Sequence, residues 1–112
     1  MSVTAEDPMA AILARYERFE GHPLDRLTGA VRAGGMRVTD TRMGHVGVVK
    51  EVAHDGMCVG YISRAADRTH VLELSRKEVP ADMIAAAAQS IEVSRRNAAT
   101  HAMRAGVVMA MG

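Results

Sequence analysis

The residue types that could do chemistry gather in one stretch of the chain, residues 44–62, with the sequence GHVGVVKEVAHDGMCVGYI. Its recurring glycines raise the question of a phosphate-binding loop. Such loops use closely spaced glycines to join a strand to a helix, often with a Lys-Ser/Thr pair. Here the glycines alternate with valines and flank Asp55-Gly56, a pair typical of tight hairpin turns. The stretch therefore predicts strands and bends, and no phosphate site.

The side chains that catalyse reactions or bind metals are few. Cys58, the only cysteine, lies in the interior of a predicted strand, which is typical of a buried and inert thiol. Ser63 and Ser75 lack the flanking glycines of a nucleophile elbow. His45 and His54 can face each other across a hairpin, but no two histidines show the helical spacing of zinc ligands. The histidines are His22, His45, His54, His70 and His101. We predict no catalytic residue, metal or cofactor, and identify no small-molecule substrate; a small enzyme or metal protein is the second alternative.

Basic side chains form the first candidate binding surface. Arginine suits phosphate and carboxylate partners, so a basic edge favours nucleic acid as a partner. Surfaces that bind nucleic acids usually pair basic charge with stacking aromatic residues, whereas this chain has 3% aromatic residues and a net charge of +1. A nucleic-acid- or transcription-associated module is therefore the first alternative. The residues of this candidate basic edge are Arg37, Arg42, Lys50, Arg64 and Arg68.

An alanine-rich helix forms the second candidate surface. Pro80 is typical of a helix start, and small and apolar residues follow at helical spacing until Gly106, where we expect the helix to end. Alanine favours the helix and lets another backbone come close. A spare face on this helix predicts a protein partner or a homo-oligomer. The residues of this candidate helix face are Ile84, Ala88, Ile91, Ala98 and Ala102.

Two further helices are predicted at the start of the chain. Asp7 can cap the first, Tyr16 and Phe19 continue its apolar stripe, and Gly21 ends it. The second begins at Pro23 and stops at residues 34–35, a double glycine. From there the apolar period changes to two, and alternating residues predict four short strands. The fold class is therefore α+β: a small antiparallel β-barrel or meander, flanked by an N-terminal helical pair and a long C-terminal helix.

A chain of 112 residues is typical of one domain. We divide it into a helical segment (1–34), a β-barrel (35–79), a C-terminal helix (80–106) and an apolar tail (107–112). The first residues lack the basic and apolar regions of a secretion signal, and no apolar run is long enough to span a membrane. These features predict a soluble cytoplasmic protein.

The run GMRVTDTRMGHVGVVKEVAHDGMCVGYI resembles the SH3-like barrels of the KOW and Tudor kind. The resemblance covers residues 35–74 and implies a small barrel. Many members of this class that grip peptides carry an aromatic cluster, whereas Tyr61 stands alone here. The resemblance therefore leaves the ligand open, and the leading interpretation is a non-enzymatic module for protein–protein interaction or assembly. The matching residues are Gly35, Val38, Gly44, Gly47, Val49, Val52, Asp55 and Gly56.

Overall fold

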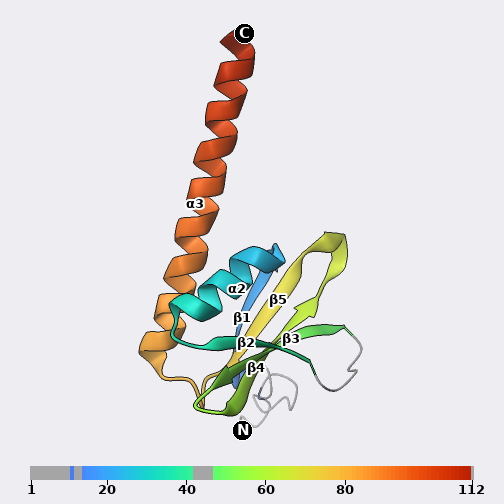
Figure 1. The fold of residues 1–112 in the computed structure, drawn as a ribbon, viewed down its shortest axis with the longest axis vertical. Coiled ribbons are helices and arrows are strands. Elements are labelled where there is room, and N and C mark those ends of the chain that lie inside the picture. The colour runs from blue at the N-terminus through green and yellow to red at the C-terminus, as the bar shows by residue number, and fades with distance from the viewer. Residues whose placement is uncertain (1–10, 12–13, 42–46, 112) are drawn as a thin grey trace, which may run out of the picture.

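The computed structural model of the chain describes residues 11, 14–41 and 47–111, with side chains as far as Ala102. Arg42, Gly44 and His45 lie outside the described residues. Figure 1 shows the order of the elements along the chain. They are β1 (Tyr16–His22), α2 (Leu24–Ala33), β2 (Arg37–Asp40), β3 (Val48–His54), β4 (Met57–Arg64), the 3-10 turn η2 (Ala66–Arg68), β5 (His70–Ser75) and α3 (Ala81–Met111).

The described strands form one open antiparallel sheet with the order β1-β5-β4-β3-β2. Strands β2 to β5 follow one another as the predicted meander. β1 then pairs with β5 at the far side, so that β1 and β2 are the two edges of the sheet (Figure 1). The α+β class and the meander are confirmed. A closed barrel is not shown, because the two edge strands do not pair with each other.

The first predicted helix is wrong over its second half. Tyr16–His22 is a strand, paired with β5 in a register that places Phe19 opposite Leu72. Tyrosine and phenylalanine favour strands, and an apolar contact across the sheet outweighs the helical spacing of the sequence. The first part of that helix, residues 7–10 and 12–13, lies outside the described residues. The N-terminal helical pair is therefore not confirmed.

The second predicted helix is confirmed as α2. Pro23 precedes its first residue, and its last turn ends at Gly34, whose N–H donates to the carbonyl of Ala30 at 3.0 Å. Leu27 and Val31 are fully buried, as the apolar stripe predicts. α2 connects the two edge strands, so it crosses one face of the sheet.

Residues 48–62 of the glycine- and valine-rich stretch lie in the β3–β4 hairpin. Asp55 and Gly56 have φ angles of 52° and 77°, the left-handed conformation that the tight turn between twisted strands needs. Gly60 has another role: a Cβ atom there would lie 2.2 Å from the carbonyl oxygen of Glu73. Glycine at this position therefore lets β4 and β5 approach, while the turn glycine sets the direction of the chain.

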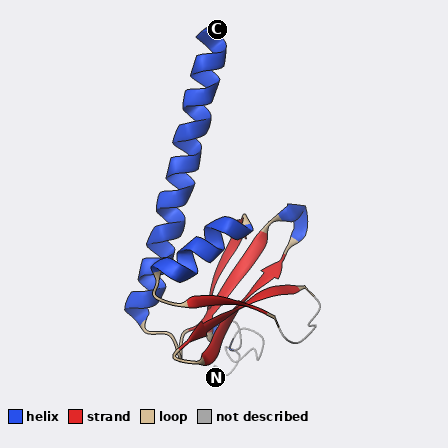
Figure 2. Cartoon of the chain, in the orientation of Figure 1, coloured by secondary structure: helices blue, strands red, loops and turns tan. Residues whose placement is uncertain are grey.

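The core lies between the sheet and the two helices, which Figure 2 shows on one side of the strands. Aliphatic residues of β3, β4 and β5 meet residues of α2 and of the first half of α3. One row across the sheet illustrates the pattern, since Val38 pairs with Val52, Val52 with Gly60, and Gly60 with Leu74. The buried core residues are Leu27, Ala30, Val31, Met36, Val52, Val59, Ile62, Leu72, Leu74, Val79, Ala87 and Ile91.

α3 is longer than predicted. It begins at Ala81, directly after Pro80, and continues to Met111, so the expected end at Gly106 is wrong. A single glycine inside a helix costs only about 1 kcal/mol relative to alanine, which a long alanine-rich helix tolerates. No helix in the described part of the chain combines the length and the apolar character needed to cross a bilayer.

Candidate functional site

The candidate helix face is divided by the structure into two parts. In residues 81–94, here called the packed segment of α3, Ile91 is 5% exposed and Ile84 packs against the core. Ala88 is partly buried in the same segment. The expectation of a spare face is therefore wrong for the two isoleucines, because they are used inside the chain's own core.

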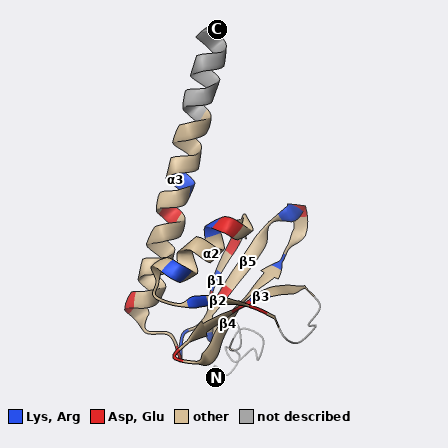
Figure 3. Ribbon diagram, in the orientation of Figure 1, with Lys and Arg blue, Asp and Glu red and all other residues tan. Residues whose placement is uncertain are grey.

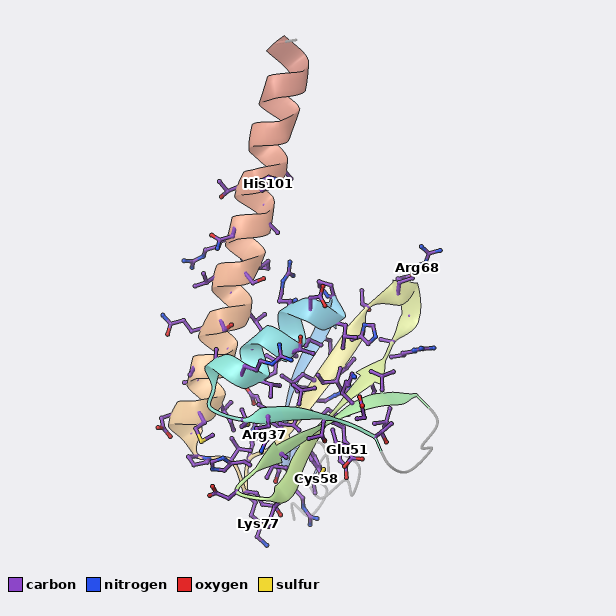
Figure 4. All side chains as sticks on the ribbon, viewed as in Figure 1. Arg37, Glu51, Cys58, Arg68, Lys77 and His101 are labelled. Atoms are coloured by element: carbon purple, nitrogen blue, oxygen red, sulfur yellow. The ribbon has the colours of Figure 1, made fainter. Side chains whose placement is uncertain are left out.

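The second part of the face is exposed. Residues 95–111, here called the projecting segment, extend beyond the sheet and α2 (Figure 1). Ala98 and Ala102 continue the stripe of Ile84 and Ile91 at helical spacing, and both are exposed. Figure 4 places His101 on a stretch of α3 that no other element accompanies. The apolar stripe thus leaves the domain without gaining a partner among the described residues.

An open groove leads from the domain onto this segment. It has a volume of about 580 Å³ and is lined by Ala33 at the end of α2 and by α3 residues from Ala86 to Asn97. Val93 lies in the groove and is 46% exposed. The groove lies on the side of α3 that carries Ser90, Val93 and Asn97, roughly 100° or more around the helix from the stripe of Ile91 and Ala98.

Polar contacts mark the point where α3 leaves the domain. The Nε of Arg26 on α2 donates to the hydroxyl of Ser94 at 3.2 Å, and its Nη1 lies 3.2 Å from Nδ1 of His22. Burial lowers the pKa of His22 below its ordinary value of 6.5, and the positive charges of Arg26 and Arg95 lower it further. Neutral His22 can accept a hydrogen bond from Arg26, so this junction is favoured when the imidazole is uncharged.

The candidate basic edge is spread across the domain. Arg37 pairs with Ala53 at one end of β3, whereas the backbone N–H of Arg64 donates to the carbonyl of Gly47 beyond the other end. At about 3.3 Å per residue these two ends are roughly 20 Å apart. Arg68 lies in η2 at the tip of the β4–β5 connection, far from Arg37 in Figure 4.

Lys50 forms an ion pair with Asp40. Its Nζ lies 2.6 Å from a carboxylate oxygen of Asp40 on the neighbouring strand β2. The hydrogen bond from Lys50 lowers the pKa of Asp40, which keeps the carboxylate charged. Figure 3 shows basic and acidic residues interspersed over several elements. Arg37 therefore lies apart from Arg64 and Arg68, and the charge of Lys50 is paired with that of Asp40.

The helix-free face of the sheet carries a polar row that sequence reasoning missed. Neighbouring strands place Arg18 opposite Glu73, Glu73 opposite Tyr61, and Tyr61 opposite Glu51. The register of the predicted meander brings Glu51, Tyr61 and Glu73 together, whereas Arg18 joins the row only through β1. Arg18 and Glu73 form a cross-strand pair of opposite charge, which stabilises a sheet, and two glutamates flank the ring of Tyr61.

Cys58 lies near this row and is exposed, so the expectation of a buried thiol is wrong. A bulge between Val52 and Ala53 shifts the register where β4 starts, which turns Cys58 outward. Its hydrogen bond with Tyr61 raises the pKa of the Tyr61 phenol, and burial adds to the rise. The phenol therefore stays protonated at neutral pH.

Metal ligands do not gather in the described part of the chain, where no group of three histidine, cysteine or carboxylate side chains lies close enough to hold an ion. His54 instead lies 3.4 Å from a carboxylate oxygen of its neighbour Asp55. The pairing of His54 with His45 across a hairpin is not tested, because His45 lies outside the described residues.

Comparison with known proteins finds no family model, curated protein or solved structure that matches this chain. The resemblance to SH3-like barrels therefore stays a prediction. The division of α3 into a packed and a projecting segment is the feature that points to a function.

Proposed function

We propose that the chain is a non-enzymatic interaction module whose projecting segment is bound by a protein partner. One observation carries this proposal: α3 extends beyond the core of the domain after Ser94, yet stays helical to Met111. The described side chains from Arg95 to Ala102 are exposed. In proteins most helical stability comes from packing of one helix face, and the described side chains of this segment have no such packing. A partner that packs against the segment would therefore stabilise it.

The chemistry of the projecting segment defines its partner. Its exposed alanines allow the backbone of a second helix to come close, as in other helix-in-groove contacts. The segment contains three arginines and no aspartate or glutamate. Arg95 and Arg96 both pair with a single carboxylate, Glu92, at 2.7 and 3.3 Å. An acidic amphipathic helix complements this surface, whereas two copies of the segment would repel each other.

Binding of nucleic acid through the basic edge has less support. Arg37 and Arg64 lie at opposite ends of β3, and Lys50 is paired with Asp40. If nucleic acid were the partner, its affinity would fall steeply with salt, because neutralised phosphates release counterions. A gel shift at low salt that disappears at high salt would favour this alternative.

Two glutamates placed on the projecting segment test the proposal. A partner is first identified by affinity purification with the full chain and then titrated against purified variants by calorimetry. We expect Ala98→Glu/Ala102→Glu to weaken binding by about tenfold or more, since both charges would enter the interface. Ala85→Glu is the matched control, because Ala85 is exposed on the packed segment. Unchanged affinity of the double variant would contradict the proposal.

A further inference from the structure

The two edges of the sheet differ in their capacity to pair with another strand. β2 has four residues, while β1 has seven and contains neither proline nor lysine. Long regular edge strands invite pairing with another chain, and proteins usually protect them with short length, proline, charged side chains, bulges or a covering helix or loop. β1 keeps an unbroken register with β5 from Tyr16 to Glu20 and is bulged only at Gly21. β1 is therefore the longer edge, and its charged side chains decide which strand can pair with it.

The hydrogen-bond alternation of the sheet shows which groups of β1 point outward. The N–H of Arg76 donates to the carbonyl of Arg15 at 2.8 Å, which makes these two residues a hydrogen-bonded pair. In an antiparallel ladder such pairs alternate, so Glu17 and Phe19 bond to β5. The backbone N–H and C=O groups of Arg18 and Glu20 consequently point away from the sheet. No other described strand pairs with them.

We infer that β1 pairs antiparallel with β1 of a second copy of this chain, placing Arg18 opposite Glu20 of the partner copy. This register centres the two-fold axis on Phe19. It joins the outward backbone groups of Arg18 and Glu20 into hydrogen-bonded pairs and creates two symmetric pairs of opposite charge. The inference concerns a surface separate from the projecting segment of α3.

Charge complementarity selects this register over its neighbours. A shift by one hydrogen-bonded step in one direction places Arg18 opposite Arg18 of the second copy, and in the other direction Glu20 opposite Glu20. Like charges directly opposite each other destabilise a sheet. In the favoured register Glu17 lies opposite Gly21 of the second copy. Because glycine has no side chain, nothing from the second copy is pushed toward the start of α3. At the start of α3, Glu17 forms an ion pair with Arg76 of its own chain, close to Ala81.

The charged side chains at this edge are exposed and can form new ion pairs with a second copy. Arg18 makes an ion pair of 3.0 Å with Glu20 and a longer one of 3.8 Å with Glu73. The side chains of Arg18 and Glu20 are 38% and 61% exposed. On pairing, each guanidinium exchanges the carboxylate of its own chain for that of the second copy. The face of the sheet that carries the row of Glu51, Tyr61 and Glu73 would then continue across both copies.

Charge reversal in the full chain tests the inference by sedimentation equilibrium over a wide range of concentration. We expect the wild type to dimerise, and Arg18→Glu and Glu20→Arg each to raise the dimer dissociation constant by about tenfold or more. An equimolar mixture of the two variants restores opposite charges at both pairs, so heterodimers should form with an affinity near that of the wild type. Arg64→Glu, with the same change of charge at an exposed position away from β1, should dimerise normally.

Other outcomes would overturn the inference. A monomeric wild type would contradict it, even if that monomer binds extended peptides of other proteins. Single variants that dimerise like the wild type would contradict it as well. So would an equimolar mixture of the two variants that fails to form heterodimers. Should a variant not fold, amide hydrogen exchange of the wild type decides. The amides of Arg18 and Glu20 must become protected as the concentration rises, and unchanged exchange would contradict the pairing. Loss of partner binding in Ala98→Glu/Ala102→Glu without loss of the dimer would separate this inference from the proposed function.

Discussion

The two segments of α3 belong to one continuous helix but differ in what surrounds them. The packed segment buries Ala87 and Ile91 against α2 and the sheet, whereas the projecting segment exposes Ala98 and Ala102 on the same stripe. Both segments are rich in alanine, so composition alone does not separate them. The difference comes from the length of the domain, which ends where Ser94 meets Arg26. A helix can therefore be part of a core and a binding surface in succession.

The largest expected effect comes from removing a core contact of the packed segment. Ile91→Ala should lower the free energy of unfolding by about 2–5 kcal/mol, because it deletes buried methyl groups and leaves a cavity. Val93→Ala, two residues away but 46% exposed, should cost less than about 1 kcal/mol. Urea unfolding measures both. Equal effects would show that the packed segment is not held as described.

A smaller effect is expected where the packed segment meets α2. A Cβ atom at Gly34 would lie 2.9 Å from the carbonyl oxygen of Met83 and 2.9 Å from Cε of Met36. Gly34→Ala should therefore cost about 1–3 kcal/mol, as overpacking does. Gly29→Ala is the control in the same helix, since nothing lies within 4 Å of its Cβ position. The control should be neutral or stabilise by up to about 1 kcal/mol, and thermal unfolding compares the two.

The junction between the two segments should respond to pH. The pKa of His22 is lowered in the folded chain, so the unfolded chain binds a proton first as the pH falls. The contribution of neutral His22 to stability is therefore complete above pH 6.5, the ordinary pKa of the side chain, and is lost as the pH falls below that value. His22→Gln should reduce the drop in melting temperature between pH 7.5 and pH 5. An equal drop in the variant and the wild type would contradict this role.

The smallest effect is expected from removing the projecting segment. A chain that ends after Ser94 should unfold with a free energy within about 1 kcal/mol of the full chain, since the described side chains it loses are exposed. A chain that ends after Ala86 should lose cooperative unfolding, because Ala87 and Ile91 belong to the core. A large loss of stability in the first truncation would mean that the projecting segment also holds the domain.

The sequence predicts the meander and α2 well because each has an unambiguous local signal. The valine alternation of β3 and the pair Asp55-Gly56 dictate a hairpin, and Pro23 and the double glycine delimit the helix. Sequence reasoning missed β1 because the spacing of three between Tyr16 and Phe19 fits one face of a helix, whereas in the strand these residues lie on opposite faces. Only the pairing of β1 with β5, distant in sequence, decides between helix and strand.

The candidate site was predictable in its residues but not in its extent. Helical spacing correctly groups Ile91 with Ala98, yet burial depends on where α2 and the sheet end in space. The convergence of basic residues likewise depends on strand order, which places Arg37 and Arg64 at opposite ends of β3. The role of the charged side chains of β1 depends on the position of this strand at the edge of the sheet, which strand order alone decides.

Amide hydrogen exchange along α3 of the purified chain tests the division of this helix most directly. We expect amides near Ala87 and Ile91 to exchange only through global unfolding. Amides beyond Arg95 should exchange much faster and become protected only when the partner is added. Equally strong protection of both segments in the chain without a partner would contradict the account, because the projecting segment would already be held.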